Sequence, residues 1–293
     1  MTQINPFLRW AGGKKWITNQ LKLILGDISI NHYHEPFLGS AAVFFSLETK
    51  KTSYLSDANS ELVTTYKAIK DYPLEVIETF QNFFNNEEQY YLIRAMNPRD
   101  DIERAARFIY LNQTSYNGLY RVNRQGGYNV PYGFRETMIY NTDRILIASQ
   151  KLKKTNLSHG DFTINKYKIQ QGDLVFLDPP YTVSHNNNGF IEYNQNLFSL
   201  KDQYRLSKFI DYIKAKGAHY ILTNAAHSTI REIFDKGDRV LELNRYSLIG
   251  GKNSKRKKIT EFVFTNIFGG EANDKLGKDS FRERTYSCKT IKK

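Results

Sequence analysis

The stretch Asp173-Leu-Val-Phe-Leu-Asp-Pro-Pro-Tyr181 is the part of this chain that decides its fold. Its first half, through Leu177, is a short apolar run of the kind that forms a buried strand. Asp178, Pro179, Pro180 and Tyr181 follow at once, and they place a carboxylate, a rigid turn and an aromatic ring at the strand's carboxyl end. Open α/β folds bind ligands at that edge of the sheet. We therefore predict an α/β fold with a site directly after this strand.

The four residues after the strand suit the binding of a flat base that carries an exocyclic amine. Asp178 can accept a hydrogen bond from the amine, and so can the carbonyl of Pro179, whose φ is fixed by its ring. Tyr181 offers a face on which a base can stack. The alternative is an ordinary Pro-Pro turn with a capping aspartate, and the tetrapeptide by itself leaves that alternative open.

Composition narrows the class of protein. The chain has 293 residues, of which 40% are hydrophobic and 25% charged, as in a soluble globular protein with one large domain or one domain with an insertion. Its net charge of +12 favours a phosphate-bearing partner, although a basic protein can also bind acidic membranes. The net charge alone does not distinguish a nucleic-acid partner from an acidic membrane.

The cysteine content and the N-terminus indicate a compartment. The chain has one cysteine, Cys288, so disulfides and cysteine zinc sites within the chain are excluded and a reducing environment is favoured. The N-terminus lacks the pattern of a signal peptide, and the apolar run 41–47 is too short to cross a bilayer. We expect a cytoplasmic protein without a membrane span. The six histidines form no metal-ligand pattern, so we expect no metal.

Alternation of strand and helix patterns extends over most of the chain. We expect strands at 33–37, 53–57, 156–159, 174–177, 218–224, 239–246 and 259–266, and helices at 40–47, 142–152, 201–214 and 228–234, the first of them capped by Ser40. No helix separates the last two strands, so they must pair as a hairpin. The expected fold is a Rossmann-like, mostly parallel sheet with one antiparallel strand.

The region between the second strand and residue 144 differs from the rest. It is helical as far as Leu111, and an alternating pattern around Gly126-Gly127 then predicts a β-hairpin at 119–132. We expect a catalytic domain formed by 1–56 and 145–270, into which 57–144 is inserted as a recognition domain. Residues 271–293 are expected to form a loose basic tail.

A cofactor site is predicted at the first strand-to-helix turn. The turn Glu35-Pro-Phe-Leu-Gly-Ser40 has one glycine instead of the three of a dinucleotide fingerprint, which favours an adenosyl cofactor without a pyrophosphate. Asp57 ends the next strand, where an acid can bind ribose hydroxyls. Asp161 and Phe162 follow a further strand and suit an adenine ring, although a single strand-end aspartate is more often a helix cap.

Several segments, taken in order, resemble the Dam-like family of DNA adenine-N6 methyltransferases, which use S-adenosylmethionine. They are Phe7-Leu-Arg-Trp-Ala-Gly-Gly-Lys14, Glu35-Pro-Phe-Leu-Gly-Ser40, Tyr116-Asn-Gly-Leu-Tyr-Arg-Val-Asn123, Tyr128-Asn-Val-Pro-Tyr-Gly133, Gly160-Asp-Phe162 and Asp178-Pro-Pro-Tyr181. The resemblance covers the chain from about Asn5 to Asn266. Its motif order is that of the group whose recognition domain follows the cofactor half.

The resemblance implies a role for each matching residue. The motif Asp178, Pro179, Pro180 and Tyr181 would hold a flipped-out adenine. The methyl donor would be lined by Trp10, Lys14, Phe37, Gly39, Asp57, Asp161 and Phe162. Double-stranded DNA would be contacted by Arg9, Tyr116, Asn117, Leu119, Arg121, Asn123, Pro131 and Arg135.

Two positions depart from the family pattern, and one basic loop lies outside it. Arg9 stands where the family commonly has lysine, and it can make the same contact to guanine. Arg135 follows Phe134, whereas the family's arginine comes directly after the glycine. The loop that contains Lys255, Arg256 and Lys257 lies in the last hairpin and can contact phosphate.

The resemblance also bears on the target and the partners. GATC is the commonest target of the family, and we expect it here. An RNA adenine or protein-glutamine methyltransferase is an alternative, as is a relative that binds DNA without catalysis. We expect a monomer, and a separately acting restriction endonuclease is compatible with this interpretation.

Overall fold

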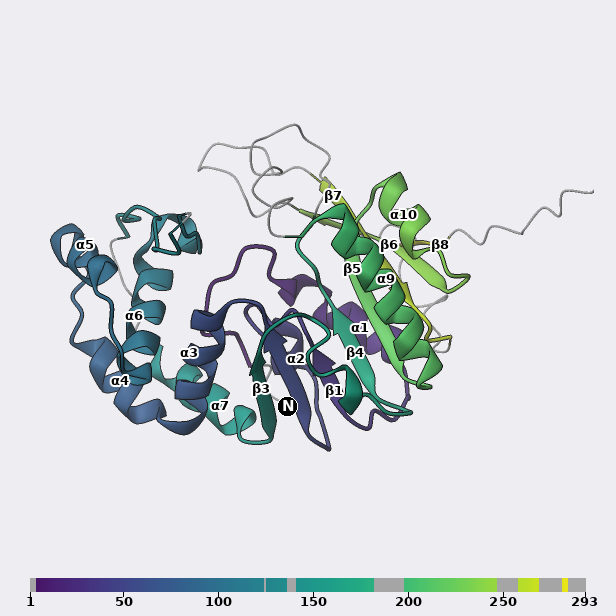
Figure 1. The fold of residues 1–293 in the computed structure, drawn as a ribbon, viewed down its shortest axis with the longest axis horizontal. Helices are drawn as coiled ribbons and strands as arrows, with labels where there is room; N and C mark the ends of the chain where they lie inside the picture. The colour runs from purple at the N-terminus through teal and green to yellow at the C-terminus, as the bar shows by residue number, and fades with distance from the viewer. Residues whose placement is uncertain are drawn as a thin grey trace, which may run out of the picture. The chain divides into compact units, whose positions relative to one another are not determined.

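The computed structural model describes residues 4–123, 125–135, 141–181, 198–246, 258–268 and 281–283. The chain divides into two compact units. The first unit consists of Met1–Thr18 and His32–Lys168, and the second of Asn19–Asn31 and Ile169–Lys293. Each unit is described here by itself (Figure 1).

Three short parallel strands form the sheet of the first unit. They are β1 (Tyr33–Glu35), β2 (Ser53–Asp57) and β3 (Thr155–His159), in the order β3-β2-β1. Ser53 pairs with both Tyr33 and Thr155, so all three strands begin in register. Their carboxyl ends therefore share one edge, and residues that follow β2 and β3 gather there.

Helices make up most of the first unit (Figure 1). They are η1 (Lys14–Ile17), α2 (Ala42–Ser46), α3 (Ser60–Asp71), α4 (Pro73–Gln81), α5 (Glu87–Ala95), α6 (Asp101–Thr114), η2 (Tyr116–Gly118), α7 (Thr142–Leu152) and η3 (Lys166–Lys168). Side chains of Asn59, Asn86, Asp100 and Asn141 accept hydrogen bonds from free amides at the starts of α3, α5, α6 and α7. Helix α6 packs against α3, α4 and α5 and buries Tyr110. The helical character predicted for this region is confirmed.

The start of α2 differs from the prediction. Ser40 was expected to cap this helix, but its N-cap residue is Ala41, in the left-handed conformation with φ of 55° and without a side-chain cap. The predicted cap is therefore wrong. The tight turn that ends in Gly39 sets the direction of the chain here, and the helix begins only after it.

The second unit is built on β4 (Leu174–Leu177) and β5 (His219–Ala225), which are parallel. The predicted hairpin follows: β6 (Arg239–Tyr246) and β7 (Lys258–Thr265) are antiparallel, and β7 is antiparallel to β5. A further short strand, β8 (Phe281–Glu283), pairs with β6 inside the segment expected to be a loose tail. The order is β4-β5-β7-β6-β8. The expected α/β class with an antiparallel hairpin is confirmed.

Helices α1 (Thr18–Leu25), α9 (Leu200–Ala215) and α10 (Ser228–Phe234) belong wholly or mostly to this unit (Figure 1). Ser199 and Asp202 form a capping box at the start of α9. All four residues of β4 are buried, as expected for a strand covered on both faces. The unit's largest buried side chains include Phe176, Tyr220 and Phe264.

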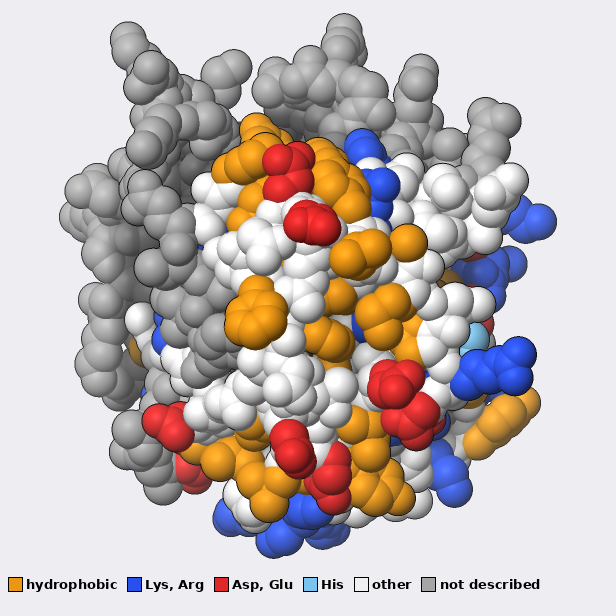
Figure 2. Space-filling view, turned by 90° about the vertical axis from the view of Figure 1, so that its left-hand side faces the viewer, with side chains coloured by type: hydrophobic (Ala, Val, Ile, Leu, Met, Phe, Trp, Pro, Cys, Tyr) orange, Lys and Arg blue, Asp and Glu red, His pale blue; other side chains and the backbone are white. Residues whose placement is uncertain are grey.

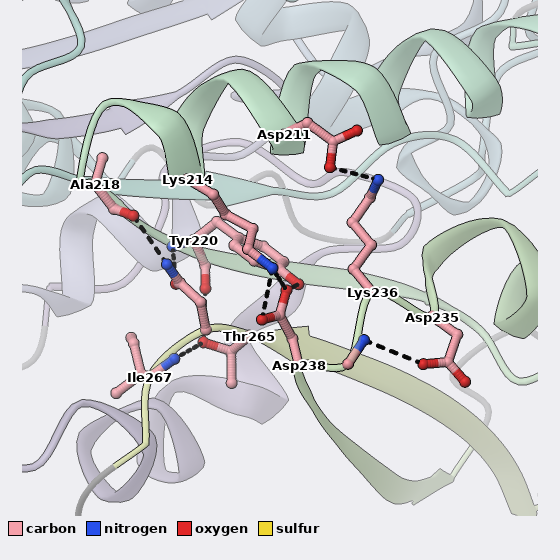
Figure 3. A network of polar contacts seen from close by, with 11 residues as sticks. Asp211, Lys214, Ala218, Tyr220, Asp235, Lys236, Asp238, Thr265 and Ile267 are labelled. Carbon is pink, nitrogen blue, oxygen red and sulfur yellow. Dashed lines mark hydrogen bonds and ion pairs between the residues drawn. The ribbon is translucent and has the colours of Figure 1, made fainter. Parts of the chain in front are cut away.

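A polar network holds the hairpin of the second unit to β5 and α9 (Figure 3). The buried carboxylate of Asp238 accepts from Lys214 of α9 at 2.6 and 2.8 Å, and from the Tyr220 hydroxyl at 2.8 Å. Asn266 bonds the carbonyl of Ala218 and the amide of Tyr220 at the end of β7. These bonds fix the hairpin near the amino end of β5. The Asp-Pro-Pro-Tyr motif lies at the opposite edge of the sheet, after the carboxyl end of β4.

Candidate functional site

The Asp-Pro-Pro-Tyr motif comes directly after β4, at the carboxyl end that the sequence predicted. Asp178 is partly exposed, and its Oδ1 accepts a hydrogen bond of 2.8 Å from the hydroxyl of Thr223 on β5. Pro179 is buried, and Pro180 is partly exposed. Since Thr223 is fully buried, the hydroxyl that orients this carboxylate belongs to the core of the unit.

The tyrosine of the motif is held by the antiparallel strand. The Tyr181 hydroxyl donates a hydrogen bond to Oε2 of Glu261, a fully buried residue of β7. The sequence pattern predicted neither Glu261 nor Thr223 as part of the site. A signal for Glu261 was present: it falls in phase with buried Val263 and Thr265, where an apolar residue is expected.

The predicted cofactor turn is tied to the end of β2. The Gly39 amide donates to Oδ2 of Asp57 at 3.0 Å, and the Asn59 amide donates to Oδ1 at 2.9 Å. Helix α3 is capped by Asn59, so Asp57 is not simply its cap. Burial raises the pKa of the Asp57 carboxyl, and the hydrogen bonds from Gly39 and Asn59 oppose that rise. Asp57 thus holds the turn that the sequence assigned to the cofactor.

Gly39 has no space for a side chain. Its φ is +47°, and a Cβ there would lie 2.9 Å from Cδ1 of the Trp10 ring. Trp10 in turn stacks on Tyr120 with a centroid distance of 5.6 Å and on Phe108 at 6.4 Å. The ring of Trp10 therefore lies against the cofactor turn and also against residues of the predicted recognition region.

The other predicted cofactor residues also belong to the first unit. Phe37 and Phe162 stack on each other, with centroids 5.6 Å apart. Asp161 is exposed, and its Oδ1 accepts from the amide and hydroxyl of Thr163. Lys14 is buried, and its ammonium donates to the carbonyl of Gly12 at 3.2 Å. Their roles toward a ligand stay predictions.

The predicted hairpin forms a compact loop with little regular strand. Isolated antiparallel bridges join Val122 to Tyr128 and Ser115 to Tyr132. The Asn123 side chain organises the tip, because its Oδ1 accepts from the amides of Gln125 and Gly127 at 3.0 and 2.9 Å. Asn123 therefore has a structural task in addition to the DNA contact predicted for it.

Most residues expected to contact DNA are at least partly exposed in this loop region. Tyr116, Asn117, Arg121, Pro131 and Arg135 are exposed, and Leu119 is partly so. Arg121 is oriented by Asn129, whose Oδ1 accepts from Nε at 2.8 Å. The three basic residues predicted to contact phosphate, Lys255, Arg256 and Lys257, lie outside the described residues.

Arg9 is held next to the hairpin loop by Asn112 and by its close approach to Gly118. Asn112 bonds its backbone on both sides, at 2.8 Å to the amide and 2.6 Å to the carbonyl. Its guanidinium lies against Gly118, where a Cβ would be 2.7 Å from Cζ. Burial lowers the pKa of Arg9, and Arg135 lowers it further. Among the described residues, none bonds its buried Nη1. Such a donor is suited to a ligand.

Two surface features of the first unit lie apart from these residues. A shallow depression of about 460 Å³ is lined by Lys50, Lys51, Lys153 and Lys154 near the starts of β2 and β3, the edge opposite to Asp57. On the side that carries α4 and α5, hydrophobic side chains are scattered among acidic ones, and basic ones lie toward the rim (Figure 2). Neither feature coincides with the predicted cofactor residues.

Membrane spans and metal clusters are both absent from the described residues. No helix in the described segments is long and apolar enough to span a membrane. Within the same segments, no three histidine, cysteine, aspartate or glutamate side chains are grouped to bind a metal ion.

Comparison with known proteins is consistent with these features. The chain is 34% identical over 274 residues to the type II methyltransferase M1.LlaDCHI of Lactococcus lactis subsp. cremoris, covering 90% of this chain and 95% of that one. It is 33% identical to the type II methyltransferase M.MjaIII of Methanocaldococcus jannaschii, covering 90% and 99%. It is 32% identical to the DNA adenine methylase of Serratia marcescens, covering 71% and 78%.

Structural similarity is more distant, and the family match is extensive. A precorrin-6y C5,15-methyltransferase from Geobacter metallireducens aligns with a TM-score of 0.39 and 10% identity, over 89% of this chain and 94% of that one. The sequence model of one family matches residues 10–248. The chain belongs to the D12 class N6 adenine-specific DNA methyltransferases.

Proposed function

We propose that this enzyme transfers a methyl group from S-adenosylmethionine to N6 of an adenine that is flipped out of a short duplex site, with GATC as the expected target. The observation that carries the proposal is the oriented carboxylate of Asp178, held by Thr223 at the end of β4 beside Pro179 and Tyr181. Among flat bases with an exocyclic amine, the family selects adenine.

The residues of the motif act by holding the amine. The Asp178 carboxylate and the Pro179 carbonyl each accept a hydrogen bond from one N–H of the amine. These two bonds favour a pyramidal nitrogen with an available lone pair. The Tyr181 ring stacks on the base and returns about 1–3 kcal/mol of the unstacking cost of a few kcal/mol. Since a sulfonium methyl group is already activated, positioning is the main contribution of these side chains.

The first unit offers residues that fit an adenosyl cofactor. Gly39 lets the turn lie close to the Trp10 ring, where a Cβ would come within 2.9 Å of Cδ1, and Asp57 holds the turn at the end of β2, where an acid can bind ribose hydroxyls. A single-glycine turn suits a cofactor without a pyrophosphate. When bound, S-adenosylmethionine supplies an electrophilic methyl group. Trp10, Lys14, Phe37, Asp161 and Phe162 would complete its surroundings.

DNA recognition is assigned to 57–144, the proposed recognition domain. The exposed residues of the hairpin loop, namely Tyr116, Asn117, Arg121 and Pro131, would enter the duplex. Arg9 would make a bidentate contact to guanine with its guanidinium, whose buried Nη1 has no partner among the residues that the structure describes. The names of the type II relatives favour a separately acting restriction endonuclease as a genetic partner, and we expect the enzyme itself to be a monomer.

The first experiment tests catalysis by Asp178. Methyl transfer to unmethylated genomic DNA is measured for the wild type and Asp178→Ala, and modified adenines are mapped by single-molecule sequencing. Modification at adenines of one short motif is expected. The variant should lose at least about 100-fold in kcat, because a charged acceptor at the reacting amine is removed, while binding of S-adenosylmethionine is kept.

A control variant separates this effect from a general loss of charge. Asp211 is an exposed residue of α9 that pairs with Lys236 at 2.7 Å, so Asp211→Ala should keep turnover. Normal turnover of Asp178→Ala would refute the proposed role of the motif. Methylation of RNA alone would refute the substrate.

A further inference from the structure

The two partners of the Asp-Pro-Pro-Tyr motif come from one face of the second unit's sheet. Glu261 of β7 lies directly opposite Ala225 of β5, so their side chains project from the same face. Thr223 precedes Ala225 by two residues and therefore projects from that face as well. Asn224 projects from the opposite face and bonds Gln203 of α9 at 3.1 Å. Thr223 and Glu261 thus support the motif from a common surface.

Both partners are fully buried polar groups, and each bonds a functional side chain of the motif. The Thr223 hydroxyl lies 2.8 Å from Oδ1 of Asp178 and 3.5 Å from the carbonyl oxygen of Leu177. Glu261 accepts from the Tyr181 hydroxyl. A buried hydroxyl or carboxylate is costly unless it is bonded, so these bonds favour one geometry strongly.

We propose that Thr223 and Glu261 are positioning residues for the target base. Thr223 fixes the rotation of the Asp178 carboxylate, and Glu261 fixes the position of the Tyr181 ring by holding its hydroxyl end. The inference rests on the proposed function, since it needs Asp178 and Tyr181 to hold the base.

The two bonds are compatible with binding of a base by the motif. A carboxylate has about four acceptor positions, so the bond from Thr223 does not by itself prevent Asp178 from accepting from another donor. Glu261 binds Tyr181 at its hydroxyl, at the end of the ring, so it orients the ring without covering its face. A displacement of about 1 Å can lower a rate about 100-fold, so both bonds should act on turnover more than on affinity.

The test of Thr223 compares Thr223→Val with Thr223→Ser. Valine keeps the shape of the side chain and removes the hydroxyl, whereas serine keeps the hydroxyl. On unmethylated genomic DNA, Thr223→Val should lower kcat about 10- to 100-fold. KM for DNA and the affinity for S-adenosylmethionine should change less than about 3-fold. Thr223→Ser should recover most of the lost turnover.

Thr265→Val is the matched control for a structural effect. Thr265 is also a buried threonine of this sheet, and its hydroxyl bonds the carbonyl of Tyr220 at 2.6 Å, away from the motif. Thr265→Val should lower the unfolding temperature of the protein and leave kcat unchanged. If Thr223→Val and Thr265→Val have the same kcat, or if Thr223→Ser fails to recover turnover, the inference is wrong for Thr223.

The test of Glu261 uses a double-mutant cycle with Tyr181→Phe and Glu261→Met, because methionine keeps the length of the side chain and removes the oxygens that accept from the hydroxyl. Tyr181→Phe keeps the ring and removes the hydroxyl, and it should lower kcat about 10-fold, the effect of one oriented hydrogen bond. Glu261→Met should lower kcat about 10-fold as well, but only while the hydroxyl is present, so the double variant should resemble Tyr181→Phe. Effects that multiply would contradict a role of Glu261 through Tyr181.

Failure of this inference and failure of the proposed function give different results. If Asp178→Ala keeps turnover, the proposed function fails and the positioning roles fail with it. If Asp178→Ala is inactive while Thr223→Val and Glu261→Met turn over normally, only the positioning roles are refuted.

Discussion

At the scale of single residues, Gly39 shows how one backbone position shapes the predicted cofactor site. Its left-handed φ and its close approach to Trp10 both exclude a side chain. Its amide bonds Asp57, and its carbonyl accepts from the Tyr66 hydroxyl at 3.0 Å. The turn is therefore held from two sides by residues that come later in the chain.

Gly39→Ala should weaken the binding of S-adenosylmethionine at least about 10-fold and lower the free energy of unfolding by about 1–3 kcal/mol. The added Cβ must displace the Trp10 ring, which is stacked on Tyr120. Isothermal titration and chemical denaturation measure the two effects. Gly237→Ala is the control, because Gly237 also has a positive φ of 71° but has open space around its Cβ position. It should cost stability only, and equal loss of cofactor affinity in both variants would contradict the steric argument.

At the scale of elements, helix α2 depends on a lysine from α7. The ammonium of Lys151 donates to the carbonyls of Phe45 and Leu47 at 3.0 and 2.5 Å, and it lies 5.3 Å from the Phe44 ring centroid. A cation there complements the negative end of the helix. Burial lowers the pKa of Lys151 to about 8, although Glu48 and Glu35 oppose the shift.

This shift predicts how stability depends on pH. The unfolded lysine titrates near 10.5, so between pH 8 and 10.5 the unfolded state binds more protons than the folded one. The free energy of unfolding of the wild type, relative to Lys151→Gln, should therefore rise as pH increases through this window. Urea denaturation at pH values of about 7.5, 9 and 10 measures the difference, in which other titrating groups cancel. A flat difference would show that the pKa of Lys151 is the same in the folded and unfolded states, and a falling one would show that folding raises it; either result contradicts the prediction.

The hairpin loop shows what sequence patterns can and cannot predict about an element. Alternation around Gly126-Gly127 indicated two strands, and bridges such as that between Val122 and Tyr128 do join the two arms. The Asn123 side chain replaces part of the expected strand ladder at the tip. Alternation reports which residues share a face, but it does not report a side chain that competes for backbone amides.

At the scale of the whole molecule, the net charge of +12 fits an enzyme that acts on DNA. We expect neutralisation of Lys255, Arg256 and Lys257 to flatten the dependence of log affinity on log salt concentration, by about 0.9 for each phosphate that these side chains neutralise in the wild type. Titration of labelled duplex DNA at several salt concentrations measures the slope.

The control removes the same charge elsewhere. Lys201, Lys208 and Lys216 are exposed lysines on or next to α9, and their triple glutamine variant should keep the wild-type slope. Equal slopes for the wild type and the Lys255, Arg256 and Lys257 variant would exclude phosphate contacts by that loop.

The order of residues along the chain was enough to predict the family, the α/β class, most element positions and the Asp-Pro-Pro-Tyr motif at the end of β4. These features are local, because strand and helix periods and strand-end residues are written in consecutive positions. The partners of the motif became visible only in the folded unit. Thr223 is 45 residues from Asp178, and Glu261 is 80 residues from Tyr181. Which buried polar groups meet depends on strand pairing and register, and these follow from the packing of the whole unit.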